Sequence, residues 1–181
     1  LIGGAEKGDL SLLLRAHGKG GHSMAPLPTS AIGRLARGLK RLEENPLPTH
    51  LDVLRTTFQA VGPAAQTSLQ ISFANLWLFK RAVRKRMESS PQSNAAIRTT
   101  TALTMVNGGI KDNILPQMAE AVVNFRLMPQ DSVASVIEHV RRVIDDEAVE
   151  IEIFEDSAWE ASPVSPVDGS AYQSLSRCIR E

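Results

Sequence analysis

Gly18-Lys19-Gly20-Gly21-His22-Ser23 follows closely on Leu10-Ser11-Leu12-Leu13-Leu14-Arg15-Ala16, and this pair of stretches decides the fold. The earlier stretch has the length and apolar bias of a β-strand, which we place at residues 7–17. The later one is a loop whose glycines let the backbone adopt positive φ and approach a ligand closely. His22 would therefore lie just past a strand end, where binding residues are common. A plain surface turn that happens to contain a histidine is the alternative.

Composition limits the kind of protein that this chain can form. Its 181 residues, 43% of them hydrophobic, suffice for one domain with a buried core but not for two large domains. The 20 basic and 20 acidic side chains balance, so we expect neither nucleic acid nor a membrane as a partner. The single cysteine excludes an internal disulfide and a thiolate metal cluster. The chain begins at Leu1 and ends within a helical pattern, so we interpret it as a piece of a longer protein whose compartment is not indicated.

Hydrophobic periodicity predicts four strands and two regular helices. The strands are expected at residues 7–17, from their apolar bias, at 98–106, where β-branched and apolar residues alternate, and at 119–127 and 149–154, where apolar residues alternate with other ones. The first helix would start from Thr29 or Ser30 and end at Asn45-Pro46, and the second would run from Asp131 or Ser132 to about Asp146. Their apolar stripes are Ile32, Leu35, Ala36, Leu39 and Leu42 in the first, and Val133, Val136, Ile137, Val140 and Ile144 in the second.

An inserted helical arm is expected between the first helix and the second strand, at about residues 46–97. It would hold a short helix at 51–61, a longer one at about 69–87, and a loop at 89–94. Leu69, Phe73, Leu76, Trp77, Val83 and Met87 fall on or near one stripe of the longer helix. Its basic cluster is Lys80, Arg81, Arg84, Lys85 and Arg86. Such a cluster can bind phosphate or lipid, but we favour the solvated face of an amphipathic helix.

The order strand, helix, arm, strand, strand, helix, strand is that of the ferredoxin-like, or split βαβ, fold. We therefore predict an α+β domain with a four-stranded antiparallel sheet and two helices on one face. This domain would cover residues 1–156, and residues 157–181 would be a linker and the start of a further helix. An exposed sheet edge beside an amphipathic helix favours pairing with a second copy, so a homodimer is expected.

Few residues in the chain suit catalysis on their own. The four histidines are scattered and match no metal-binding motif, so we expect no metal site within the chain. Ser23 adjoins His22 but has no nucleophile elbow around it. Asn113, in a second glycine-bearing loop, and Arg126, near a strand end, would suit the binding of a polar or carboxylate group. The alternatives are a turn role for Asn113 and cross-strand pairing of Arg126 with Glu150 or Glu152.

Three motifs in order carry a resemblance to a known family. They are Gly18 to Ser23, then Asn107-Gly108-Gly109-x-Lys111-x-Asn113-Ile114-Leu115-Pro116, then Val122-Val123-Asn124-Phe125-Arg126-Leu127-x-Pro129. Together they resemble the lid or dimerisation domain of the zinc-dependent aminoacylases and carboxypeptidases, most closely the carboxypeptidase S and N-fatty-acyl-amino-acid hydrolase branch. Residues 5–8, 75–79, 98–102 and 162–165 add to the match, which spans nearly the whole chain.

The resemblance implies a function that the residues alone do not. His22 would stabilise the oxyanion at the scissile carbonyl, while Asn113, Gly109 and Arg126 would bind the substrate, Arg126 facing its α-carboxylate. Two zinc ions would belong to a separate catalytic domain, so this piece alone would be inactive. The substrate would be a peptide or N-acyl amino acid with a free carboxylate. The alternative is a non-catalytic interaction module of ferredoxin-like fold, used for assembly.

Overall fold

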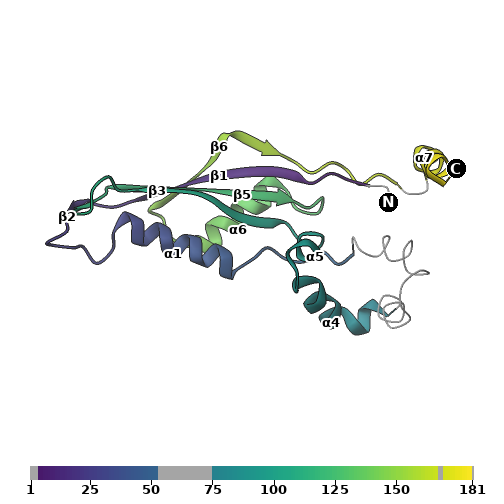
Figure 1. Cartoon of the computed structure of the whole chain (residues 1–181), viewed down its shortest axis with the longest axis horizontal. Coiled ribbons are helices and arrows are strands. Elements are labelled where there is room, and N and C mark those ends of the chain that lie inside the picture. The colour runs from purple at the N-terminus through teal and green to yellow at the C-terminus, as the bar shows by residue number, and fades with distance from the viewer. Residues whose placement is uncertain (1–3, 53–74, 167–168, 181) are drawn as a thin grey trace. The chain divides into compact units, whose positions relative to one another are not determined.

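The computed structural model describes residues 4–52, 75–166 and 169–180. It divides into two compact units (Figure 1). Residues 1–46 and 101–181 form one, which we call the sheet unit, and residues 47–100 form the other, which we call the arm. Within the described ranges, no helix is both long and apolar enough to cross a membrane.

The sheet unit is built on four strands in the order β3 (Thr100–Gly108), β5 (Met118–Leu127), β1 (Gly8–His17) and β6 (Val149–Trp159). The first strand lies in the middle and pairs antiparallel with β5 along its whole length and with β6 on its other side. Across the sheet from β6 to β3, the strands are the fourth, first, third and second of these four in the sequence. This order confirms the predicted ferredoxin-like arrangement.

Two helices, α1 (Ala31–Glu44) and α6 (Val133–Ile144), lie on the same side of the sheet (Figure 1). Both begin where the sequence predicted, because Ser30 and Ser132 each accept a hydrogen bond from a backbone N–H in the first turn. The core under them comes from alternate residues of two strands, since successive side chains of a strand point to opposite faces. It contains Leu10, Leu12, Leu14 and Ala16 of β1 and Val123, Phe125 and Leu127 of β5.

The predicted apolar stripe of α1 was wrong in part. Leu35 and Leu42 are buried as expected, but Gly38 shares their face, while Ile32 and Ala36 are exposed. The physical reason is close packing, because Gly38 has no side chain and lies against Ile144 of α6. Ile32 lies beside Gly108 at the end of β3, so it extends the apolar surface along the edge of the sheet.

The last strand is longer than predicted, reaching Trp159 instead of residue 154. Its pairing with β1 shifts register between Leu10 and Leu12, and Glu155 and Asp156 take positive φ there. A bulge of this kind bends a strand without ending it. Beyond it the two ends of the unit run together, because the N–H of Ser162 donates to the carbonyl oxygen of Glu6 at 3.0 Å. A final helix, α7 (Ser170–Arg180), follows where the sequence expected one.

The arm contains α4 (Leu76–Glu88) and α5 (Pro91–Ala95) around a small core of Leu51, Ile97 and Met87. The predicted helix at 51–61, apart from its first two residues, and the start of the one at 69–87 fall outside the described residues. The predicted loop at 89–94 is wrong, because Ser90 caps a short helix with proline in its first turn. Trp77 does not belong to the buried side of α4, because the Trp77 side chain is 79% exposed. Val83, which was predicted on the same stripe, is buried.

Candidate functional site

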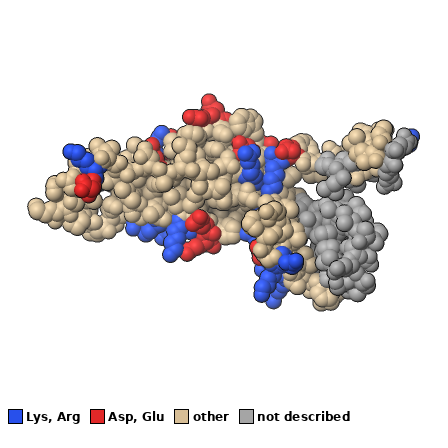
Figure 2. Space-filling view, viewed as in Figure 1, with Lys and Arg blue, Asp and Glu red and all other residues tan. Residues whose placement is uncertain are grey.

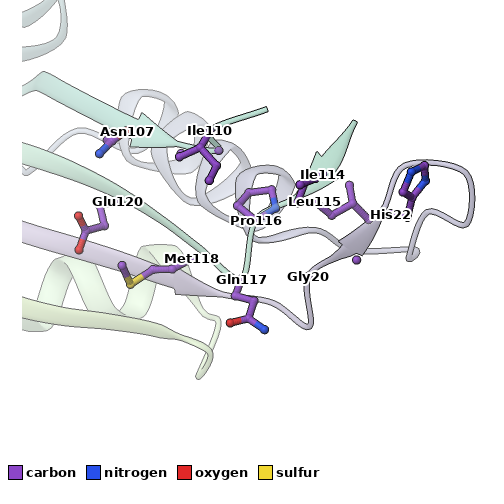
Figure 3. Close-up of a pocket in the computed structure, with 13 residues that line it drawn as sticks. Gly20, His22, Asn107, Ile110, Ile114, Leu115, Pro116, Gln117, Met118 and Glu120 are labelled. Carbon is purple, nitrogen blue, oxygen red and sulfur yellow. The ribbon is translucent and has the colours of Figure 1, made fainter. Parts of the chain in front are cut away.

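The glycine-rich loop folds back as half of a small ribbon at the end of the sheet. In this ribbon β2 (Gly21–His22) pairs antiparallel with β4 (Ile114–Leu115), so that His22 lies opposite Ile114. Gly20, just before β2, has φ 63°, and a Cβ atom there would lie 2.7 Å from the Gln117 side chain. Only glycine takes this conformation at low cost, so the sequence pattern has a direct structural use. The ribbon carries His22 out into solvent (Figure 3).

The His22 imidazole has one ring nitrogen occupied and one available. The backbone N–H of Met24 donates to His22 Nδ1 at 3.2 Å. A neutral imidazole that accepts at Nδ1 carries its proton on Nε2. The exposed ring therefore presents Nε2–H as a hydrogen-bond donor.

Asn113 and Gly109 lie in the loop that faces His22 across the ribbon. The N–H of Ser23 donates to the backbone carbonyl oxygen of Asn113 at 3.1 Å, which joins the two loops next to His22. The Asn113 side chain is exposed. Gly109 takes φ 80°, a conformation that favours glycine, and it turns the chain at the end of β3. The structure thus brings three of the four predicted site residues to one end of the sheet unit.

A pocket of about 680 Å³ opens beside this ribbon (Figure 3). Apolar side chains of the β4 loop form much of its wall, and Gly109 and His22 also line it. Its polar members Asn107, Gln117 and Glu120 were not predicted from the sequence. Asn107 adjoins the glycine pair that the sequence did single out, but nothing in the pattern pointed to Gln117 or Glu120.

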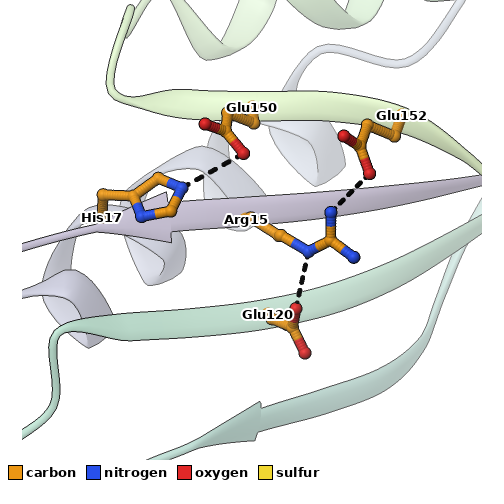
Figure 4. A network of polar contacts seen from close by, with 5 residues as sticks. All are labelled: Arg15, His17, Glu120, Glu150 and Glu152. Carbon is orange, nitrogen blue, oxygen red and sulfur yellow. Dashed lines mark hydrogen bonds and ion pairs between the residues drawn. The ribbon is translucent and has the colours of Figure 1, made fainter.

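Glu120 is held in place by a charge network on the open face of the sheet (Figure 4). Arg15 Nε donates to Glu120 at 2.7 Å, and the same guanidinium contacts Glu152 of β6. The hydrogen bond to Glu120 is the main cause that raises the pKa of Arg15 above its ordinary value. Next to it, His17 Nε2 lies 3.2 Å from Glu150. The carboxylate that lines the pocket is therefore a paired one.

Arg126 lies at the other end of the sheet unit. It is eight positions along β5 from Met118, roughly 27 Å at the rise of a β-strand. Its side chain is 58% exposed, and its guanidinium lies 3.4 Å from Asp9, which also accepts a hydrogen bond from Asn124. The alternative pairing with Glu150 or Glu152 is not found, because those carboxylates contact His17 and Arg15. Within one chain, His22 and Arg126 do not meet.

Metal ligands do not gather in the parts of the chain that the structure describes. No group of three or more His, Cys, Asp or Glu side chains there could hold a metal ion. The acidic side chains of the open face contact Arg15, His17 and Arg126 instead. These described residues do not fit a zinc centre.

The chain matches a known family and several relatives. A family model described as a peptidase dimerisation domain matches residues 4–152. The chain is 38% identical over 184 residues to the mouse N-fatty-acyl-amino acid synthase/hydrolase PM20D1, a match that covers 99% of this chain and 36% of the mouse protein. It is also 38% identical over 178 residues to a carboxypeptidase S-like protein of Dictyostelium discoideum, covering 98% and 34%. The chain thus spans about a third of the length of these relatives.

Solved structures agree with the fold. Human carnosine dipeptidase 1 superimposes with a TM-score of 0.57 at 14% identity, covering 99% of this chain and 42% of the dipeptidase. The metallo-carboxypeptidase Sso-CP2 of Sulfolobus solfataricus gives 0.59 at 18% identity, covering 96% and 48%. The three sequence motifs, the ferredoxin-like sheet and these matches lead to one conclusion: the chain belongs to the peptidase dimerisation domain family.

Proposed function

We propose that this chain is the substrate-binding lid and dimerisation domain of a two-zinc hydrolase. The domain would be residues 1–156, with a helical insertion at about 46–97, and residues 157–181 would lead back to a catalytic domain that holds both zinc ions. The observation that carries the proposal is His22, exposed on a ribbon beside a pocket with Nε2–H as its available donor. The enzyme would cleave a peptide or N-acyl amino acid amide bond next to a free carboxylate, in keeping with the names of its relatives.

The proposed role of His22 is to donate a hydrogen bond from Nε2–H to the carbonyl oxygen of the substrate. Cleavage of an amide bond builds negative charge on the carbonyl oxygen, and a fixed donor aimed at that oxygen lowers the barrier by about 3 kcal/mol. His22 Nε2–H would be this donor, and Asn113 and Gly109 would hold the neighbouring part of the substrate. Arg126 would bind the α-carboxylate, because a guanidinium matches a carboxylate with two parallel hydrogen bonds.

A single chain cannot assemble these roles, because the carboxylate and the scissile carbonyl of one substrate are only a few bonds apart. His22 and Arg126 lie at opposite ends of the sheet unit. A two-fold axis at the β3 edge would resolve this, since antiparallel pairing of two β3 strands brings the Gly108 end of one beside the Thr100 end of the other. His22 of one protomer would then approach the Arg126 end of its partner.

The edge that would form this dimer is apolar and exposed. Met105 and Val106 of β3 are 59% and 73% exposed, and Ile32 of α1 lies beside the same edge. Exposed apolar strand edges tend to pair with another chain, and a homodimer places the same patch on both sides of the interface. The proposed dimer would therefore use β3 together with the exposed side of α1.

Mixed dimers of the full-length enzyme test this arrangement. His22→Ala and Arg126→Ala enzymes should each be nearly inactive alone. If the site is shared between protomers, a mixed dimer keeps one site with both residues intact, and random mixing should restore about a quarter of wild-type turnover. Activity should be measured after co-expression of the two variants with different affinity tags, and compared with an equal mixture of separately purified variants.

The outcomes of this experiment separate the possibilities. No recovery in the mixed dimer would mean that both residues act within one chain, which the separation along β5 argues against. Full activity of both single variants would instead leave the domain a non-catalytic assembly module, the alternative that the apolar β3 edge also supports.

A further inference from the structure

The neutral charge of the chain conceals two regions of opposite charge. The arm, residues 47–100, contains seven Lys and Arg residues but only Asp52 and Glu88 as acids. The sheet unit contains the remaining 13 basic and 18 acidic residues. Strong charge asymmetry between parts of a chain points to binding of an anionic partner, which the total charge did not reveal.

The positive charge of the arm is concentrated on α4. Lys80, Arg81, Arg84, Lys85 and Arg86 are all exposed, and Figure 2 shows basic side chains gathered on this part of the arm. Among the described residues, none of the five forms an ion pair with a carboxylate, since Glu88 contacts Arg98 instead. The charge of the helix is therefore available to a partner.

Large apolar side chains accompany this charge. Trp77 and Leu78, in the first turn of α4, are 79% and 61% exposed. Arg81 and Arg84 follow Trp77 by four and seven positions, a spacing that brings residues to the same side of a helix. The inner side holds Val83, which is buried. An exposed tryptophan and leucine next to five cations are not explained by solvation of a helix face alone.

We infer that α4 is a docking surface for a membrane that contains anionic lipids. Helices that lie on such membranes combine Lys and Arg, which contact phosphate head groups, with tryptophan and leucine that enter the interfacial layer. Tryptophan suits this layer because its ring is apolar and its N–H is polar. A nucleic acid would use the cations but would not need Leu78 exposed. This inference is independent of the proposed hydrolase function and replaces the expectation of no membrane partner.

Co-sedimentation of the 181-residue chain with lipid vesicles tests the inference. We expect binding to vesicles of phosphatidylcholine with phosphatidylserine, none to phosphatidylcholine alone, and release at high salt. Replacing Arg81 and Lys85 by Gln should weaken binding about 30-fold, because each cation near the surface strengthens binding about fivefold. Trp77→Ala with Leu78→Ala should weaken it at least about tenfold through the loss of apolar contact.

A matched control removes the same charge from the other unit. Arg141→Gln with Arg142→Gln changes two exposed residues of α6 and should alter vesicle binding less than about twofold. In a Trp159→Phe chain, Trp77 is the remaining tryptophan, and its emission should shift to the blue when anionic vesicles are added.

Two results would overturn the inference. One is absence of binding to anionic vesicles at low salt by a chain whose circular dichroism shows it folded. The other is binding of a single-stranded oligonucleotide as tightly as of vesicles, with no change in Trp77 emission, which would assign the surface to nucleic acid.

Discussion

Strand β1 and β2, the half of the ribbon that carries His22, follow one another in the chain but differ in pairing and burial. Ten residues of β1 pair with β5, and its inward side chains are fully buried. The ribbon has two residue pairs, and His22 in it is exposed. Buried apolar area stabilises a fold, whereas an exposed donor contributes little to stability and remains free to act on a ligand. The residues that stabilise the fold and the residue proposed for chemistry are therefore different, although they lie within about fifteen positions of each other in the sequence.

The largest expected effect is at the core beneath β1. Phe125 of β5 is completely buried opposite Leu10, so Phe125→Ala should lower the free energy of unfolding by about 3–5 kcal/mol through lost burial and a cavity. Urea denaturation of the chain measures this. Phe125→Leu keeps most of the volume and should cost less than half as much. An equal loss from both variants would contradict the cavity explanation.

The next effect separates function from stability at the ribbon. His22→Ala in the full-length enzyme should lower kcat by about 10²–10³ while changing the free energy of unfolding by less than about 0.5 kcal/mol. His17→Ala is the matched control, because His17 is also exposed but contacts Glu150 on the open face. Its kcat should stay near wild type. Similar losses in both variants would show that the effect is not specific to the ribbon.

The smallest effect concerns the junction of β1 with the pocket. Arg15→Gln removes the partner of Glu120 and Glu152, and should lower the free energy of unfolding only slightly, because these ion pairs are partly exposed to solvent. The pKa of Arg15 is higher in the folded chain than in the unfolded chain. The ion pairs of Arg15 therefore stabilise the fold fully at every pH below its pKa in the unfolded chain, and this stabilisation is lost only as the pH rises through its pKa in the folded chain. The cost should therefore be constant across the neutral range in urea titrations. A steep change there would point to the carboxylates instead.

Local sequence patterns predicted those parts of the fold that depend on short-range physics. Ser30 and Ser132 cap helices because their hydroxyls reach a backbone N–H three residues later. Alternation in β5 predicted its buried face, because side chains of a strand alternate whatever surrounds them. The glycines before His22 predicted a tight turn, and Gly20 indeed takes positive φ.

Patterns failed where a long-range contact decides the outcome. The buried side of α1 depends on the close approach of Gly38 to Ile144, more than a hundred residues away. The partner of Arg126 is Asp9, set by the register of β1 with β5. Neither the position of Glu120 in the pocket wall nor the exposure of Trp77 can be read from periodicity, because both depend on which neighbours cover them.

By itself, the sequence determined the four strands of the sheet and the two helices that pack on it, their order, the turn that carries His22, and the motifs that identify the family. These follow from backbone sterics, capping and periodicity, which act within a few residues. Only the tertiary structure decided that Asn113 joins His22 while Arg126 lies at the opposite end of β5, and that Trp77 is exposed on α4. Distances between residues remote in sequence are set by strand register and packing, and no local pattern encodes them.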